Sequence, residues 1–201
     1  MKLNAGCGTH YAHGWVNVDV WEDDTTTPDV IAKLNEPYPF DDGEAEAVYL
    51  GHVLEHIPWL RVSEFVADMA RVAAKDAPIL IVGPDVYRTI KLFAQGLEPW
   101  HIVEATLESQ ARHLLPPDRG RKVPGWFDPI PADSVEHHWN CHEERLASLL
   151  RSMGFDPISY SDVIPDNPDQ TSWHDDRTGI TWPVVGKHHW QFGLLIKGRG
   201  E

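Results

Sequence analysis

Cysteines, long apolar runs and cationic side chains are all scarce in this sequence. Its 201 residues include two cysteines, Cys7 and Cys141, which are too few for a disulfide framework. No apolar segment approaches the roughly 18 residues that a membrane-spanning helix needs, and the first residues lack the charged-then-apolar pattern of a secretion signal. We therefore expect a cytoplasmic protein with reduced thiols and no membrane contact, either a monomer or a homodimer.

The shortage of cations gives the chain a strongly acidic balance. Lys and Arg number 17 against 31 Asp and Glu, for a formal net charge of −14 at pH 7. Such a chain repels polyanions, which disfavours nucleic acid as a partner. The local exception is the basic stretch at residues 119–122, which lies between prolines. It suits a solvated loop, and a phosphate site is the alternative.

What the sequence does contain is a strand–turn–strand pattern at its start. A short apolar run, Lys2–Ala5, leads into the turn Gly6-Cys7-Gly8, and a second apolar run ends on Asp19. Glycines allow a tight turn and a close approach of the backbone to a ligand. An acid at the end of the next strand can accept hydrogen bonds from a ribose diol. The pattern predicts a nucleoside site at the edge of an open parallel sheet.

Two details favour S-adenosylmethionine over a dinucleotide as the nucleoside. Tyr11 stands where the third glycine of the dinucleotide motif G-x-G-x-x-G belongs. The gap from Gly8 to Asp19 is also too short for the crossover helix that holds a pyrophosphate at its N-terminus. S-adenosylmethionine has no phosphate, so the short linker suits it better.

Three motifs resemble the class I S-adenosylmethionine-dependent methyltransferases, in particular the small branch with LNxGCG, GWxNVD and HVLEH. They are LNAGCG at residues 3–8, GWVNVDV at 14–20 and PYPFDDGEAEAVYLGHVLEHI at 37–57. The segment 142–155 is similar to the late helix of this family and the start of its sixth strand. The resemblance implies an α/β fold with one doubly wound, mostly parallel seven-stranded sheet, whose last strand is antiparallel.

The resemblance also implies where S-adenosylmethionine would bind, with S-adenosylhomocysteine as the product. Ligands of open α/β sheets bind beyond the carboxyl ends of the strands. Asp19 would hold both ribose hydroxyls, and the amides of the turn after the first strand would face the methionine part. Lys33 stands where the family often has an acid for the adenine amino group. The full expected set is Asn4, Ala5, Gly6, Cys7, Gly8, Asp19, Val20, Lys33, Leu34, Gly51 and His52.

His52 and His56 are the candidate catalytic residues. Both lie beside Glu55, just after the fourth expected strand. They are four residues apart, which places them on one face if a helix begins there. An imidazole can accept a proton from a hydroxyl near neutral pH. A capping or packing role is the alternative, because holding the acceptor in line with the sulfonium can supply most of the rate.

The 12 histidines of the chain raise a metal site as an alternative. His138 and His142 have the spacing of a zinc pair on a helix, but Trp139 stands where a zinc hydrolase needs a glutamate. His188 and His189 have no third ligand at a useful spacing. We expect no metal. The rival classes are therefore a non-catalytic protein that binds S-adenosylmethionine and a metal-dependent hydrolase.

The alternation of apolar runs predicts a single domain over residues 1–201. Strands are expected at 2–5, 15–20, 29–32, 45–50, 79–82, 157–164 and 189–197, and helices at 60–74, 89–94, 103–114 and 142–153. The stretches 87–136 and 164–182 are expected to be insertions that set substrate specificity.

The 9 tryptophans suit either a loop-rich core or a pocket that stacks on rings and sugars. Trp15 and Trp190 lie in expected strands, whereas most of the others lie near turns or prolines. With the acidic charge, this pattern favours a small-molecule or saccharide acceptor. We expect the methyl group to move to an oxygen or nitrogen of that acceptor.

Overall fold

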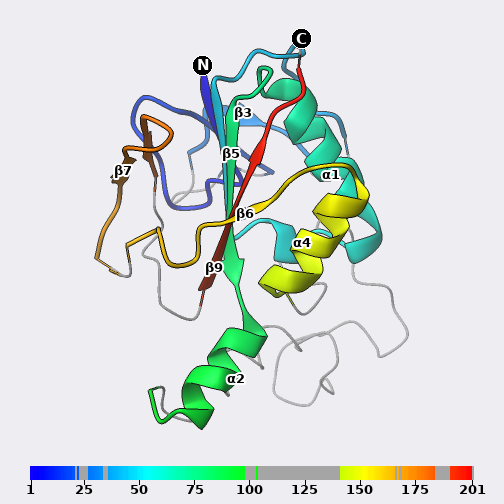
Figure 1. Ribbon diagram of the computed structural model, residues 1–201. Helices are drawn as coiled ribbons and strands as arrows, with labels where there is room; N and C mark the ends of the chain where they lie inside the picture. The colour runs from blue at the N-terminus through cyan, green and yellow to red at the C-terminus, as the bar shows by residue number, and fades with distance from the viewer. Residues whose placement is uncertain are drawn as a thin grey trace, which may run out of the picture.

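The centre of the molecule is a seven-stranded sheet (Figure 1). The computed structural model describes residues 1–20, 22, 27–33, 36–97, 103, 141–165, 167, 169–183 and 191–200. The strand order across the sheet is β3-β2-β1-β4-β5-β9-β6. These strands are β1 (Lys2–Ala5), β2 (Val16–Asp19), β3 (Val30–Ile31), β4 (Ala47–Gly51), β5 (Pro78–Pro84), β6 (Ile158–Ser159) and β9 (Gln191–Lys197).

The first five strands are parallel, and β9 is antiparallel to both of its neighbours, β5 and β6. β4 and β5 lie in the middle and are almost entirely buried. Nearly continuous apolar runs are typical of strands that are covered on both faces. The predicted α/β class, with a mostly parallel seven-stranded sheet and an antiparallel last strand, is confirmed.

Two helices, α1 (Trp59–Val72) and α4 (Glu143–Ser152), cover one face of the sheet (Figure 1). In α1 the buried residues Val62, Phe65 and Met69 recur at helical spacing. They pack with the apolar side of α4 and with the sheet in the larger of two buried clusters. Both helices lie within one or two residues of their predicted positions.

In the described part of the chain, the opposite face is covered by a hairpin and loops instead of helices (Figure 1). The hairpin pairs β7 (Trp173–Asp175) with β8 (Ile180–Trp182). The ring of Trp182 is fully buried and lies 5.8 Å from that of Trp15 and 6.5 Å from that of Tyr49. The stretch 164–182, predicted as an insertion, thus contributes to a second core that was not predicted.

α2 (Val86–Ala94) begins three residues before its predicted start, because Asp85 caps it. Asp85 Oδ1 accepts a hydrogen bond from Arg88 N at 2.9 Å. Its Oδ2 accepts from Glu143 N at 3.1 Å, so the same carboxylate fixes the start of α4 beside the end of β5.

Other predicted bounds differ more. β6 is two residues long instead of spanning 157–164, because the chain turns at Tyr160, whose carbonyl accepts from the amides of Val163 and Ile164. The predicted helix at 103–114 lies outside the described residues except for Val103, as do the first two residues of the predicted strand 189–197.

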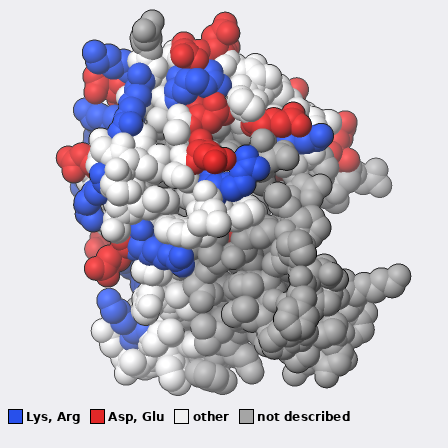
Figure 2. Space-filling model, turned by 90° about the vertical axis from the view of Figure 1, so that its right-hand side faces the viewer, with Lys and Arg blue, Asp and Glu red and all other residues white. Residues whose placement is uncertain are grey.

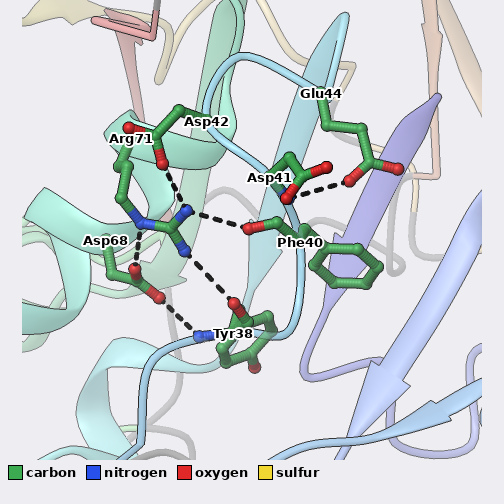
Figure 3. A network of polar contacts seen from close by, with 7 residues as sticks. All are labelled: Tyr38, Phe40, Asp41, Asp42, Glu44, Asp68 and Arg71. Carbon is green, nitrogen blue, oxygen red and sulfur yellow. Dashed lines mark hydrogen bonds and ion pairs between the residues drawn. The ribbon is translucent and has the colours of Figure 1, made fainter.

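Arg71 of α1 fixes the loop between β3 and β4 (Figure 3). Its guanidinium donates to Asp68 Oδ1 at 2.8 Å and to Asp42 Oδ1 at 2.7 Å, and also to the carbonyls of Phe40 and Tyr38. Tyr38 N donates in turn to Asp68 Oδ2 at 2.8 Å. Planar guanidinium groups suit several simultaneous acceptors of this kind. The contacts hold Tyr38 in the larger buried cluster.

Acidic and basic side chains are interspersed on the face that carries α1 and α4 (Figure 2). Among the described residues visible in that view, neither the acidic nor the basic side chains form a large patch. No helix formed by the described residues has the length and apolar character to cross a membrane.

Candidate functional site

The carboxyl ends of the parallel strands meet at one edge of the sheet. Because β9 is antiparallel, its first residue, Gln191, lies at this edge as well, opposite Pro84 of β5. Such an edge brings together residues that are far apart in sequence. The predicted site residues that the structure describes lie here or on the segments that leave the strands.

The turn after β1 needs glycine at two positions for different reasons. Gly6 has a φ of 73°, and a Cβ there would overlap Val53 Cγ2. Gly8 has a φ of 49°, and a Cβ there would meet no atom of the described residues within 4 Å. The turn therefore packs tightly against the segment after β4 at Gly6 and faces open space at Gly8.

The amides of this turn point to β2, and the prediction that they face the methionine part of a ligand is wrong. Gly6 N and Cys7 N both donate to the carbonyl of Val18, at 2.8 and 3.0 Å. Gly8 N donates to Asp19 Oδ2 at 2.7 Å. Because β1 and β2 are adjacent and parallel, the turn folds onto the neighbouring strand and its amides bind there.

Asp19 is held by two backbone amides. Besides Gly8 N, the amide of Val20 donates to Asp19 Oδ1 at 2.7 Å, and the residue is only 8% exposed. A carboxylate has about four acceptor positions, so each oxygen of Asp19 retains one. A fixed carboxylate with one remaining acceptor position on each oxygen suits two adjacent hydroxyls.

The Asn4 side chain stabilises the segment that follows the turn after β1. Its Nδ2 donates to the carbonyl of His10 at 3.1 Å and to Asn17 Oδ1 at 2.9 Å. Asn17 is fully buried; its Oδ1 also accepts from Ala12 N at 2.8 Å, and its Nδ2 donates to Asp29 Oδ2 at 3.0 Å. The Asn4 amide thus stabilises the loop between β1 and β2, which borders the site.

The predicted adenine side is described in part. Lys33 is well exposed, and its Nζ lies 3.6 Å from the exposed Glu36, so its charge is solvated. Leu34 lies outside the described residues. Ala5, at the end of β1, is fully buried.

Tyr38 and Cys7 are buried polar groups beside Asp19. The hydroxyl of Tyr38 is buried and has no hydrogen-bond partner among the described residues. Burial, followed by the charge of Asp19, raises its pKa. The same two causes raise the pKa of the Cys7 thiol to about 11, so this thiol stays protonated at neutral pH. Tyr38 was not predicted as part of the site.

His52 follows Gly51 at the end of β4 and lies at the centre of the edge. Its φ of 56° is in the left-handed region, where histidine is enriched over most other residues. Its Nδ1 lies 3.2 Å from Glu55 Oε1, and its Nε2 lies 2.5 Å from the Gln191 side-chain nitrogen. The side chain is 27% exposed. The imidazole is therefore both held in place and accessible.

His52 and His56 do not share a helix face, because no α-helix begins at His52 and the condition for a shared face is not met. The segment after His52 forms only a three-residue 3-10 turn, η1 (Leu54–His56), and α1 starts after Pro58. Ile57 is extended, with φ −99° and ψ 128°. The helical conformation is disfavoured for a residue that precedes proline, so the turn ends at Ile57, before Pro58.

Three residues of this edge were not predicted as parts of the site: Glu55, Gln191 and His10. Glu55 and Gln191 are 1% and 3% exposed. Burial, followed by the charge of His52, lowers the pKa of His10, so this second imidazole lies within electrostatic range of the first. The spacing from His52 to Glu55 is a local signal for contact in one turn, whereas Gln191 is 139 residues away from His52.

The predicted histidine clusters are described only at His142. Its Nδ1 accepts a hydrogen bond from Arg145 N at 3.2 Å, so the ring caps α4. The other members, His137, His138, His188 and His189, lie outside the described residues. In the described part of the chain, no group of three or more His, Cys, Asp or Glu could hold a metal ion.

Comparison with solved structures finds methyltransferases at low sequence identity. One from Archaeoglobus fulgidus, described as dependent on S-adenosylmethionine, is 14% identical with a TM-score of 0.48, over 97% of this chain and 84% of that chain. One from Methanosarcina mazei is 14% identical with a TM-score of 0.48, over 99% and 92%.

A third similar structure is the 1,6-didemethyltoxoflavin-N1-methyltransferase of Burkholderia thailandensis, solved with 1,6-didemethyltoxoflavin and S-adenosylhomocysteine bound. It is 13% identical with a TM-score of 0.47, over 98% of this chain and 69% of that chain. No protein-family model matches the chain, and a search of curated proteins finds no match.

Proposed function

We propose that this protein is an S-adenosylmethionine-dependent methyltransferase. The observation that carries the proposal is the Asp19 carboxylate, held by the amides of Gly8 and Val20 at 2.7 Å each. Each of its oxygens retains an acceptor position for one hydroxyl of a ribose. The segment from Gly6 to β2 contains no helix, which suits a nucleoside without a pyrophosphate.

The residues at this edge have separate roles in the proposed complex. When bound, the cofactor supplies an activated methyl group on its sulfonium. Asp19 binds the ribose, and the open space beside Gly8 admits the ligand next to the backbone. Val20, Lys33 and Leu34 border the adenine, and Gly51 and His52 border the methionine part. Asn4, Ala5, Gly6 and Cys7 shape the turn that carries Gly8.

His52 is the proposed general base, and His56 is the second candidate. The imidazole of His52 is partly exposed at the end of β4, where an acceptor can reach it. Accepting the proton of a hydroxyl or amine makes that atom a better nucleophile in the transition state. Alignment of the acceptor with the methyl group supplies the remainder of the rate.

The proposed acceptor is an oxygen or nitrogen of a small molecule or saccharide. The net charge of −14 disfavours a polyanion. Fewer tryptophans are available to line an acceptor pocket than the sequence suggested, because Trp182 is buried in the second core. We further propose a cytoplasmic protein that acts as a monomer or a homodimer.

Calorimetric titration with S-adenosylhomocysteine tests the cofactor part of this proposal. We expect the wild type to bind in the micromolar range and Asp19→Ala to lose about 1–3 kcal/mol, the cost of hydrogen bonds to a charged group. The matched control is Glu46→Gln, which removes an exposed carboxylate just before β4, at the opposite edge of the sheet. We expect it to bind as the wild type does. No binding by the wild type at high micromolar ligand would refute the proposal.

A turnover assay and zinc analysis, added to the titration, separate the rival classes. A non-catalytic binding protein would bind the ligand in the same way but would release no S-adenosylhomocysteine from S-adenosylmethionine with any acceptor. A metal-dependent hydrolase would ignore the ligand and would contain stoichiometric zinc by elemental analysis.

A further inference from the structure

His52 is constrained by two strands and a turn, namely β5, β9 and η1. Its backbone amide donates to the carbonyl of Val82 on β5 at 2.8 Å. Its Nδ1 faces Glu55, and its Nε2 faces Gln191, the first residue of β9. A left-handed backbone at a non-glycine residue costs free energy, which the surrounding contacts must offset. The imidazole is thus fixed in one orientation at the middle of the edge.

These contacts determine which ring nitrogen carries the proton when the imidazole is neutral. Glu55 Oε1 lies 3.2 Å from Nδ1, at ion-pair distance and without hydrogen-bond geometry, and its negative charge favours a proton on that nitrogen. The Gln191 amide can then donate an N–H to the lone pair of Nε2, from 2.5 Å away. In the opposite tautomer, the lone pair of Nδ1 would face the carboxylate, which is repulsive.

Both side chains that face His52 are buried, so their positions are fixed by the surrounding core. Glu55 is 1% exposed and Gln191 is 3% exposed, and a buried carboxylate is costly unless it faces a donor or a positive charge. The charge of Glu55 also helps burial to raise the pKa of the Cys141 thiol. A protonated His52 would place a positive charge at ion-pair distance from Glu55.

We propose that Glu55 and Gln191 are positioning residues that hold His52 as the Nδ1–H tautomer, with the Nε2 lone pair directed to the acceptor. This inference rests on the proposed methyl transfer and names the residues that prepare its base. The Gln191 N–H marks the position that the O–H or N–H of an acceptor would take. Gln191 therefore covers the base until an acceptor displaces it.

Every bond and proton of the proposed step can be accounted for. The acceptor oxygen or nitrogen forms a bond to the methyl carbon, and the electron pair of the broken carbon–sulfur bond stays on sulfur. The acceptor proton moves to Nε2 of His52. The Glu55 carboxylate stabilises the resulting imidazolium, and the Gln191 amide, once flipped, can accept the new Nε2–H through its oxygen.

Nitrogen-15 NMR of the imidazole rings tests the proposal without any acceptor. The His52 signals are assigned by their loss in His52→Gln, and the spectra are recorded where the imidazole is neutral. We expect the wild type to show the Nδ1–H tautomer. Glu55→Gln, which keeps the shape and removes the charge, should shift the tautomer ratio by about tenfold toward Nε2–H. Gln191→Leu should shift the ratio in the same direction by a smaller factor, because the donor to the Nε2 lone pair is lost while the Glu55 carboxylate remains, and an unchanged ratio in this variant would overturn the role of Gln191.

Glu64→Gln is the matched control, because Glu64 is an exposed glutamate on α1 that pairs with Arg61. It should leave the His52 signals unchanged. A wild type with His52 as the Nε2–H tautomer would overturn the proposal, and so would an unchanged ratio in a folded Glu55→Gln variant. Titration of the same samples with S-adenosylhomocysteine keeps the two proposals distinct: absence of binding refutes the methyltransferase, whereas the tautomer alone decides the roles of Glu55 and Gln191.

Discussion

The two halves of the carboxyl edge are built in different ways. In the cofactor half, at the ends of β1, β2 and β3, the polar contacts join residues close in sequence: Gly8 and Asp19 are 11 residues apart, and Asn17 and Asp29 are 12 apart. In the acceptor half, at the ends of β4, β5 and β9, they join distant residues: Asp85 and Glu143 are 58 apart, and His52 and Gln191 are 139 apart.

This difference implies different sensitivities in the two halves. The cofactor half depends on backbone conformation and on amides within one short segment, so single backbone changes there should be costly. The acceptor half depends on the docking of α4 and β9 against the strands that precede them. Its geometry should therefore respond to changes in tertiary packing.

Gly6→Ala should produce the largest loss of stability in the cofactor half. The φ of 73° and the overlap of a Cβ with Val53 combine backbone strain with overpacking, which together cost about 2–4 kcal/mol. Gly14→Ala is the matched control, because Gly14 has a φ of 79° but its Cβ would meet nothing within 4 Å. It should lose only the strain, about 1–2 kcal/mol. Urea denaturation measures both values, and equal losses would show that the Val53 contact is immaterial.

Asp85→Ala should weaken the acceptor half by about 2–3 kcal/mol in the free energy of unfolding. One carboxylate caps α2 and also accepts from the first amide of α4, which His142 caps, and each such contact contributes about 1 kcal/mol or more. Ser152→Ala, at the exposed end of α4, is the control with little expected effect. In hydrogen exchange, the amides of α4 should lose protection while those of β1 and β2 keep it. A uniform loss over the whole sheet would contradict the separation of the two halves.

Asp29 gives a smaller, pH-dependent effect in the cofactor half. Hydrogen bonding from the Asn17 amide is the first cause that lowers its pKa from the usual 3.8. A pKa lowered by folding contributes stability that is present above the unfolded value and is lost as the pH falls through the folded value. The difference in stability between the wild type and Asp29→Asn should therefore shrink as the pH falls below about 4. A difference that does not change between neutral and acidic pH would contradict this account.

The two thiols, one in each half, give the smallest effect. Burial raises the pKa of both, to about 11 for Cys7 and well above the usual value for Cys141. Both should react with iodoacetamide at pH 8 far more slowly than in the unfolded chain, because the thiolate is the reactive form. Cys7, which is 4% exposed, should react before the fully buried Cys141. A fast reaction of Cys141 would show that the acceptor half opens readily.

The same contrast explains how far the site could be predicted from the sequence. Gly6, Gly8 and Asp19 could be predicted as site residues, because a turn and the end of a strand are determined by a few neighbouring residues. The direction of the turn amides was predicted wrongly, since neighbouring parallel strands compete with a ligand for them. Pro58 was the overlooked signal that ends the turn at Ile57, so that no longer helix begins at His52.

The acceptor half was much less predictable. No periodicity links Gln191 to His52, because the antiparallel insertion of β9 beside β5 brings them together. The antiparallel direction of the last strand was expected only from the family resemblance. The hairpin of β7 and β8 was missed because its strands have only three residues each. Such short strands depend on tertiary contacts, here those of Trp182 with Trp15 and Tyr49.

A crystal structure of the complex with S-adenosylhomocysteine tests the central claim most directly, because that claim places one ligand across both halves. We predict that both ribose hydroxyls lie within hydrogen-bond distance of Asp19, one at each carboxylate oxygen, and that the sulfur lies beside Gly51 and His52. A ligand bound away from Asp19, or one whose sulfur lies far from His52, would contradict this account.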